Sequence, residues 1–203
     1  MAIQKGPAMF IKLIVMLSAI VVLATASEAS LVNRLPLSNN STIVSQGIAR
    51  SVIIVPNEKA YIALGQKLSD NIAKLTGVQI PVEAASDYVS EKPRLIKVDK
   101  LDRNFILIGQ VWNNAVLERL YANYYDPTDA VFPGPGGWEI RTICNPFKRG
   151  QNCIAATGSD LEGCKLAVQH FANAIKKDGS DWSVPYTVDV HLTGEAREQE
   201  EAY

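Results

Sequence analysis

The feature that most constrains this fold is a repeated order in which a short apolar run precedes an amphipathic segment. Ser51–Val55 (SVIIV) is a β-branched run typical of a strand that is buried on both faces. Over residues 58–76 apolar residues then recur at helical spacing, and these are Tyr61, Leu64, Leu68, Ile72 and Leu75. Gly77 follows at the position where a left-handed residue commonly ends a helix. Strand–helix units of this kind pack their helices onto a sheet.

The same order returns twice along the chain. Residues 78–83 predict a second strand, and Pro81 favours an edge position for it. Residues 105–109 (FILIG) predict a third strand. A helix is expected from about residue 113, with one apolar side formed by Val116, Leu117, Leu120, Tyr121 and Tyr124.

The last third of the chain begins with a predicted hairpin. Residues 138–143 alternate in polarity, which predicts a strand with one wetter face, and 152–157 is its return strand. A helix is predicted over 159–177, with Ser159 and Glu162 at the spacing of a capping box. Residues 185–192 predict a final strand. We therefore expect an α/β (α+β) fold with a single mixed β-sheet and about three packed helices.

The N-terminus predicts export. A positive flank precedes the apolar stretch Leu13–Ala24, and small residues at 24–26 suit a signal peptidase, so residues 1–26 are interpreted as a signal peptide. The protein is then secreted or periplasmic, with no membrane contact after cleavage; the alternative is an uncleaved anchor over 9–26. We expect a linker or poorly ordered segment at 27–48, an α/β accessory-type domain at 49–192 and a charged tail at 193–203.

Charge and cysteine content narrow the classes of function. Twenty basic residues against twenty-one acidic ones form no electrostatic footprint for nucleic acid. Cys144 and Cys153 flank a turn-like segment and are a candidate disulfide across the hairpin, which would leave Cys164 unpaired; buried free thiols are the alternative.

The junction of Gly158, Ser159 and Asp160 is one candidate binding site. A glycine turn that opens a helix can bind an anion through free N–H groups. Cys164 and Lys165 do not follow the phosphate-loop motif, however, and the nearby acids would repel a phosphate. The alternative is a strand-to-helix turn in which glycine permits close packing.

The long loop over 126–137 is the second candidate site. Asp126 and Asp129 lie there among aromatic residues that include Trp138, an arrangement that a sugar-binding or glycoside-cleaving site would use. The alternative is that the aspartates initiate turns while the aromatics anchor the loop to the core. Trp112 and Trp182 are predicted to be core or rim residues.

Other chemistries have little support in the sequence. The only histidines, His170 and His191, have no partner at metal-ligand spacing, so we expect no metal site and no cofactor. Cys164 and His170 are six residues apart on one predicted helix and point in different directions. The G-x-S-x-G elbow of serine hydrolases is absent from the sequence.

Three motifs in a fixed order resemble a known family. They are Phe105–Gly109 (FILIG), Trp138–Arg141 (WEIR) and Ile154–Gly163 (IAATGSDLEG). Together they resemble the small α/β domain that precedes the catalytic barrel in family 20 β-N-acetylhexosaminidases and in α-glucuronidases, and that stands ahead of other polysaccharide-degrading modules. The resemblance covers about residues 50–192. Cys164-Lys165-Leu166 departs from it, because the family often has an aromatic residue after the second glycine.

The resemblance implies a non-catalytic role, since the catalytic acids of those families lie in the barrel that follows. We therefore expect an exported α/β domain of the type appended to carbohydrate-active enzymes, with a packing, positioning or glycan-associated role and no catalytic residue. Its expected partner is a catalytic module, from a glycoside hydrolase or polysaccharide lyase, or a glycan. Two alternatives stay open: a stand-alone extracytoplasmic protein that binds a glycan or small anion, and a weak glycoside hydrolase that uses Asp126 and Asp129.

Overall fold

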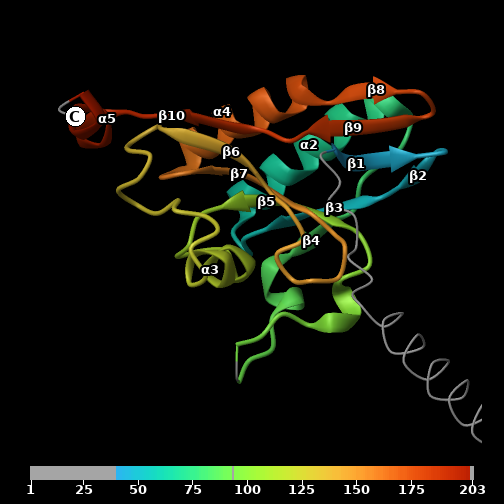
Figure 1. Cartoon of the computed structure of the whole chain (residues 1–203), viewed down its shortest axis with the longest axis horizontal. Helices are drawn as coiled ribbons and strands as arrows, with labels where there is room; N and C mark the ends of the chain where they lie inside the picture. The colour runs from blue at the N-terminus through green and yellow to red at the C-terminus, as the bar shows by residue number, and fades with distance from the viewer. Residues whose placement is uncertain (1–39, 93, 202–203) are drawn as a thin grey trace, which may run out of the picture. The chain divides into compact units, whose positions relative to one another are not determined.

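The computed structural model of the chain describes residues 40–92 and 94–201 (Figure 1). The first half contains β1 (Asn40–Ser45), β2 (Ile48–Ala49), β3 (Ser51–Val55), α2 (Lys59–Thr76), β4 (Val82–Ala84), the 3₁₀ turns η2 (Ala85–Tyr88) and η3 (Val98–Lys100), and β5 (Asn104–Gly109). The second half contains α3 (Ala115–Tyr121), β6 (Trp138–Ile143), β7 (Cys153–Gly158), α4 (Leu161–Ala174), β8 (Lys176–Asp178), β9 (Asp181–Pro185), β10 (Val188–His191) and α5 (Gly194–Glu201). The predicted signal peptide and residues 27–39 of the predicted linker lie outside the described residues.

The main sheet has six strands in the order β10-β6-β7-β5-β3-β4. Strands β4, β3, β5 and β7 run parallel, while β6 is antiparallel to β7 and β10 is antiparallel to β6. The expectation of a mixed sheet with an antiparallel hairpin is therefore confirmed, as is the edge position of β4. The strands β3, β5 and β7 are central and buried on both faces, apart from the partly buried Asn104 at the start of β5.

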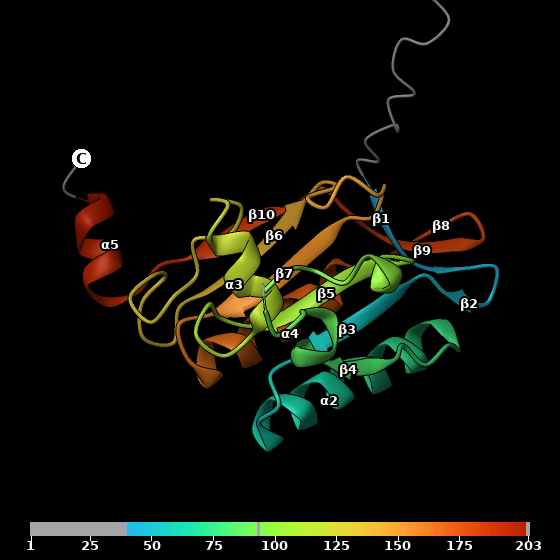
Figure 2. The same ribbon diagram turned by 90° about the horizontal axis from the view of Figure 1, so that it is seen from below.

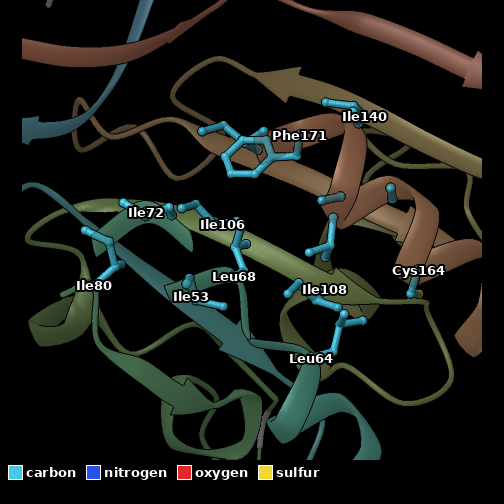
Figure 3. Close-up of a cluster of buried hydrophobic side chains, with 14 of the residues drawn as sticks. Ile53, Leu64, Leu68, Ile72, Ile80, Ile106, Ile108, Ile140, Cys164 and Phe171 are labelled. Carbon is cyan, nitrogen blue, oxygen red and sulfur yellow. The ribbon is translucent and has the colours of Figure 1, made fainter. Parts of the chain in front are cut away.

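Helices cover the two faces of this sheet unequally. Helices α2 and α4 lie on one face, and α3 lies on the other (Figures 1 and 2). The larger core lies beneath α2 and α4. Figure 3 shows side chains from β3, α2, β5, β6 and α4 converging there, among them Ile53, Leu68, Ile106 and Phe171. The second core packs α3 and η2 against the opposite face, where the Phe105 ring contacts those of Tyr88 and Phe147.

The expectation of a single sheet is wrong, because the described residues contain a second, antiparallel sheet of four strands in the order β2-β1-β9-β8. Its strand β1 belongs to the segment that was expected to be a linker, yet Ile43 and Val44 are buried in the larger core. The main partner of β1 is β9, about 140 residues later along the chain. Pairing at that separation leaves no signal in a local window of sequence, which is why a polar, Ser- and Asn-rich segment did not predict a strand.

Element ends also differ from expectation in the last third. The N-cap of α4 is Asp160 rather than Ser159, since the Asp160 carboxylate accepts a hydrogen bond from the Gly163 amide at 2.8 Å. The helix ends at Ala174, and the predicted strand at 185–192 is divided between β9 and β10, which belong to different sheets. The predicted charged tail includes α5, a polar helix that stands away from the sheet in both views (Figures 1 and 2).

The candidate disulfide does not form, because all three cysteines are free. The residue opposite Cys153 in the β6–β7 ladder is Ile143, so Cys144 is one position out of register. Neighbouring residues of a strand point to opposite faces of the sheet. Cys153 packs with Ile143 in the smaller core, where burial raises the pKa of its thiol.

The helices in the described ranges include none that is both long and apolar enough to cross a membrane.

Candidate functional site

The carboxyl ends of the parallel strands β3, β5 and β7 share one edge of the main sheet. The glycine turn follows β7 at this edge, and the segment with Asp126 and Asp129 returns there from α3 to the start of β6. Open α/β sheets commonly bind ligands at such an edge. The edge has three parts: the glycine turn after β7, the polar groups under the 126–132 loop, and a surface hollow beside α3.

The glycine turn after β7 is covered by the protein's own loop. The Ser159 hydroxyl accepts a hydrogen bond from the Gly134 amide at 3.0 Å, and the second oxygen of Asp160 accepts one from the Gly136 amide at 2.9 Å. A Cβ atom added to Gly163 would lie 2.1 Å from the Gly137 carbonyl oxygen. An anion at the start of α4 would therefore have to displace residues 133–137, and the geometry matches a packing role for Gly158, Ser159 and Asp160.

Asp126 lies at the buried end of the long loop and is only 2% exposed. One carboxylate oxygen accepts a hydrogen bond from the Thr128 amide at 2.9 Å. The other, Oδ2, is buried without a hydrogen-bond partner among the described residues. Burial raises the pKa of Asp126 above its ordinary value of 3.8, against the opposing effects of the hydrogen bonds from Thr128 and the charge of Arg141. An unpartnered buried oxygen is a group that a ligand hydroxyl or amide can satisfy.

A second acid, Glu139, is fully buried next to this loop at 0% exposure. Its carboxylate pairs with the guanidinium of Arg141 and accepts a hydrogen bond from the Thr128 hydroxyl at 3.3 Å. The Thr128 hydroxyl is also 2.9 Å from that of Thr157 on β7. Burial and the charge of Asp126 raise the pKa of Glu139 to about 7, because together they outweigh the attraction of Arg141.

Sequence reasoning missed Glu139. The alternating pattern of β6 placed it on a wetter face, but the 126–132 loop covers that face and buries the carboxylate. One signal in the sequence could have identified it: Glu139 directly follows a tryptophan in a predicted strand. A carboxylate that is buried in such a strand requires a partner within the protein.

Asp129 has a different environment from Asp126. Its Oδ1 accepts hydrogen bonds from the Val131 and Phe132 amides at 2.8 and 2.9 Å, and its Oδ2 accepts one from the Tyr121 hydroxyl at 3.2 Å. These bonds close a turn and attach the loop to the end of α3. The geometry therefore matches the turn-forming alternative for Asp129, while Asp126 is the acid that keeps an unused oxygen.

Trp138 is buried and is stacked by the protein's own rings. The His170 ring lies 4.3 Å from it, centroid to centroid, and the His191 ring lies 5.9 Å away. Both histidines of the chain thus contact one indole from α4 and β10. Trp138 is not part of the hollow that contains Asp126.

The hollow beside α3, which we call the tyrosine hollow, has a volume of about 220 Å³ and is lined by Tyr121, Tyr124, Asp126 and Pro127. The expectation that both tyrosines lie on the buried side of the helix is wrong: Tyr121 is 39% exposed and Tyr124 is 98% exposed. The helix ends at Tyr121, so helical periodicity no longer sets the direction of Tyr124.

Tyr124 holds an unusual backbone conformation. Its φ is 60°, in the left-handed region. Its amide donates to the Tyr121 carbonyl at 2.9 Å, and the Tyr125 amide donates to the Leu120 carbonyl at 2.9 Å. These two bonds form the Schellman motif, in which glycine is the usual left-handed residue. A tyrosine here bears the backbone strain of that position without recovering it by burial.

Within residues 40–92 and 94–201, the His, Cys, Asp and Glu side chains do not gather in threes as a metal site would need.

Comparison with known proteins shows little. The chain matches no family model, and no curated protein matches its sequence. Among solved structures it is similar to the X-ray structure of the Flavobacterium johnsoniae chitobiase FjGH20, with 7% sequence identity and a TM-score of 0.39. The aligned part covers 76% of this chain and 19% of the chitobiase. This partial structural match does not show the family that the sequence motifs suggest.

Proposed function

We propose that this chain is an exported, non-catalytic α/β domain of the kind appended to carbohydrate-active enzymes, and that it binds glycan through the tyrosine hollow. The observation that carries the binding role is that one hollow is lined by a fully exposed Tyr124 and by Asp126, whose Oδ2 has no hydrogen-bond partner among the described residues. The N-terminal sequence supports export, and the motif order supports the accessory-domain role.

The chemistry of the hollow suits a sugar ring. The rings of Tyr121, Tyr124 and Pro127 offer apolar surface to the C–H face of a pyranose, while the Tyr121 hydroxyl is held by Asp129. Asp126 supplies one polar group at the wall to fix orientation, as is usual in small-ligand sites. Burial raises the pKa of Asp126, and its carboxyl group can accept a hydrogen bond from a sugar hydroxyl.

The buried groups around Asp126 support binding rather than catalysis. Glu139 is fully buried against Arg141 and Thr128, and Asp129 is engaged in its turn and with Tyr121. A glycoside-cleaving pair requires two carboxyl groups that both reach the scissile bond. Asp126 is the one acid in the wall of the tyrosine hollow.

Titration of the protein with a panel of neutral, soluble oligosaccharides tests the proposal by calorimetry and by NMR. We expect Tyr124→Ala to weaken binding about tenfold, because it removes the most exposed ring of the hollow. Tyr186→Ala is the matched control, since Tyr186 is an exposed tyrosine outside the hollow. Equal affinity in wild type and Tyr124→Ala would contradict the role of the hollow.

Incubation of the same oligosaccharides with the protein tests the non-catalytic part of the proposal. We expect no cleavage products. Cleavage that disappears in Asp126→Asn would show instead that this acid takes part in hydrolysis.

A further inference from the structure

A second opening lies at the same edge of the main sheet, between the carboxyl ends of β3 and β5. After β3 the chain enters α2 on one face, whereas after β5 it enters α3 on the opposite face. The two loops therefore separate at neighbouring parallel strands, and Figure 2 shows α2 and α3 on either side of them. Ligands of open α/β sheets bind in crevices of this kind.

This opening, which we call the Trp112 crevice, has a volume of about 310 Å³. It is lined by Asn57, Glu58, Ala85, Ser86, Trp112, Asn113 and Ala115. Trp112 is 75% exposed, so it is not a core residue, and of the two expected positions only the rim fits. The physical reason is that Trp112 lies in the tight turn between β5 and α3, where neither strand nor helix periodicity directs it inward.

The polar wall of the crevice is organised before any ligand arrives. The Asn57 amide group lies 3.3 Å from the Ser86 hydroxyl and joins the start of α2 to η2. Asn113 accepts a hydrogen bond from the Gln110 amide at 3.0 Å, which fixes the turn that carries Trp112. A rigid indole beside side chains that both donate and accept hydrogen bonds matches the needs of a polyhydroxylated ring.

The crevice and the tyrosine hollow are connected through the backbone. The Val111 amide donates to the Thr128 carbonyl at 3.3 Å, so the residue before Trp112 contacts the loop that carries Asp126. Trp112 precedes α3 and Tyr124 follows it, and a helix of seven residues is about 10 Å long. The two openings therefore lie at the two ends of one short helix, a separation that a short chain of sugars can span.

We propose that the Trp112 crevice is a second subsite that extends the tyrosine hollow to a neutral oligosaccharide, with Trp112 stacking on a sugar ring and Asn57 and Ser86 binding its hydroxyls. The inference rests on the proposed function, because it assigns the hollow a ligand of several sugar units. Glu58 in the wall disfavours acidic sugars and can accept a hydrogen bond from a neutral one.

The test is a titration with homologous neutral oligosaccharides of one to six units, with Trp112→Ala and Tyr124→Ala as paired variants. In the wild type we expect affinity to rise with chain length. Trp112→Ala should remove that rise, with a loss of about tenfold for the longest chains and little change for monosaccharides. Tyr124→Ala should weaken binding at every length, and Trp112→Phe should retain most of the wild-type affinity.

The three indole N–H resonances give an independent readout of the same titration. The Trp112 resonance is assigned by its loss in Trp112→Phe, and the resonances of Trp138 and Trp182 serve as internal controls. We expect the Trp112 resonance to move with long chains and the other two to stay in place.

The outcomes separate the two proposals. The second subsite would be overturned if the Trp112 resonance did not shift and the affinity of Trp112→Ala were unchanged. Loss of affinity in Tyr124→Ala in the same experiment would leave the hollow as the site. Loss of affinity in Trp112→Ala but not in Tyr124→Ala would overturn the binding role of the hollow and leave the crevice as the site. Absence of binding to any saccharide would overturn both.

Discussion

The glycine turn after β7 and the loops after β3 and β5 occupy the same edge of the same sheet but differ in access. At the β7 end, Ser159 and Asp160 bind the amides of the 133–137 loop, and Gly163 lies against that loop's backbone. Beyond β5, Trp112 in the turn before α3 and Tyr124 just after α3 are exposed beside the two openings. The turn that most resembles a ligand site in sequence is thus filled by the protein. Of the two accessible openings, the tyrosine hollow includes Asp126 of the second predicted site, and the Trp112 crevice has no sequence motif.

The difference arises from which groups are already satisfied. A polar atom that already has a partner within the protein contributes little free energy to ligand binding, because binding would exchange one hydrogen bond for another. A buried oxygen without a partner, such as Oδ2 of Asp126, can gain one from a ligand. Whether a ligand can bind at this edge therefore depends on which polar groups of each loop already have a hydrogen-bond partner, and not on the presence of glycine.

Gly163→Ala tests the packing of the 133–137 loop against the glycine turn after β7, and we expect the largest effect from it. Glycine to alanine inside a helix ordinarily stabilises by about 1 kcal/mol. Here the added Cβ would overlap the Gly137 carbonyl oxygen, so we expect a loss of about 2–4 kcal/mol in the free energy of unfolding. Urea denaturation measures it, with Gln169→Ala at an exposed position of α4 as control. A stabilised Gly163→Ala variant would mean that the 133–137 loop yields easily.

Glu139 lies on β6, next to β7, and its titration tests how firmly the 126–132 loop is packed. The folded chain holds this proton more tightly than the unfolded chain, whose glutamate has the ordinary pKa of 4.5, because burial and Asp126 raise the folded pKa to about 7. This contribution to stability is fully present below pH 4.5 and is lost as the pH rises through 7, by up to about 3 kcal/mol.

Denaturation at a series of pH values measures this loss in the wild type and in Glu139→Gln. We expect a smaller decline between pH 4.5 and 8 in the variant, because only the contribution of Asp126, whose pKa is also raised, remains. Glu162→Gln, at an exposed position, should retain the full decline. Parallel curves for wild type and Glu139→Gln would show that Glu139 is ionised without penalty.

The smallest expected effect on stability comes from Tyr124, the exposed residue of the tyrosine hollow. Tyr124→Gly should stabilise the fold by about 0.5–1 kcal/mol, because glycine adopts the left-handed conformation freely and the tyrosine side chain buries almost nothing. Tyr124→Ala should not stabilise, since alanine keeps the strain. Denaturant midpoints distinguish the two variants, and a destabilised Tyr124→Gly would imply that the ring packs against the protein after all.

Strand and helix positions in the centre of the molecule could be predicted well from the sequence. The continuous apolar runs of β3 and β5, the apolar stripe of α2 and the left-handed Gly77 at its end all match the structure. The candidate site was predicted only in part. The loop that carries Asp126 was identified, but Tyr124 was placed on the buried side of a helix and Glu139 on a wet face.

What the sequence determined by itself is the set of features that depend on near neighbours: buried strands, amphipathic stripes, a helix cap and a turn-forming Asp129. Tertiary structure alone decided that β1 pairs with β9, that the 133–137 loop fills the glycine turn, and that Trp112 and Tyr124 stay in solvent. The physical reason is range. Periodicity and capping act over a few residues, whereas burial and free hydrogen-bonding groups depend on segments far apart along the chain.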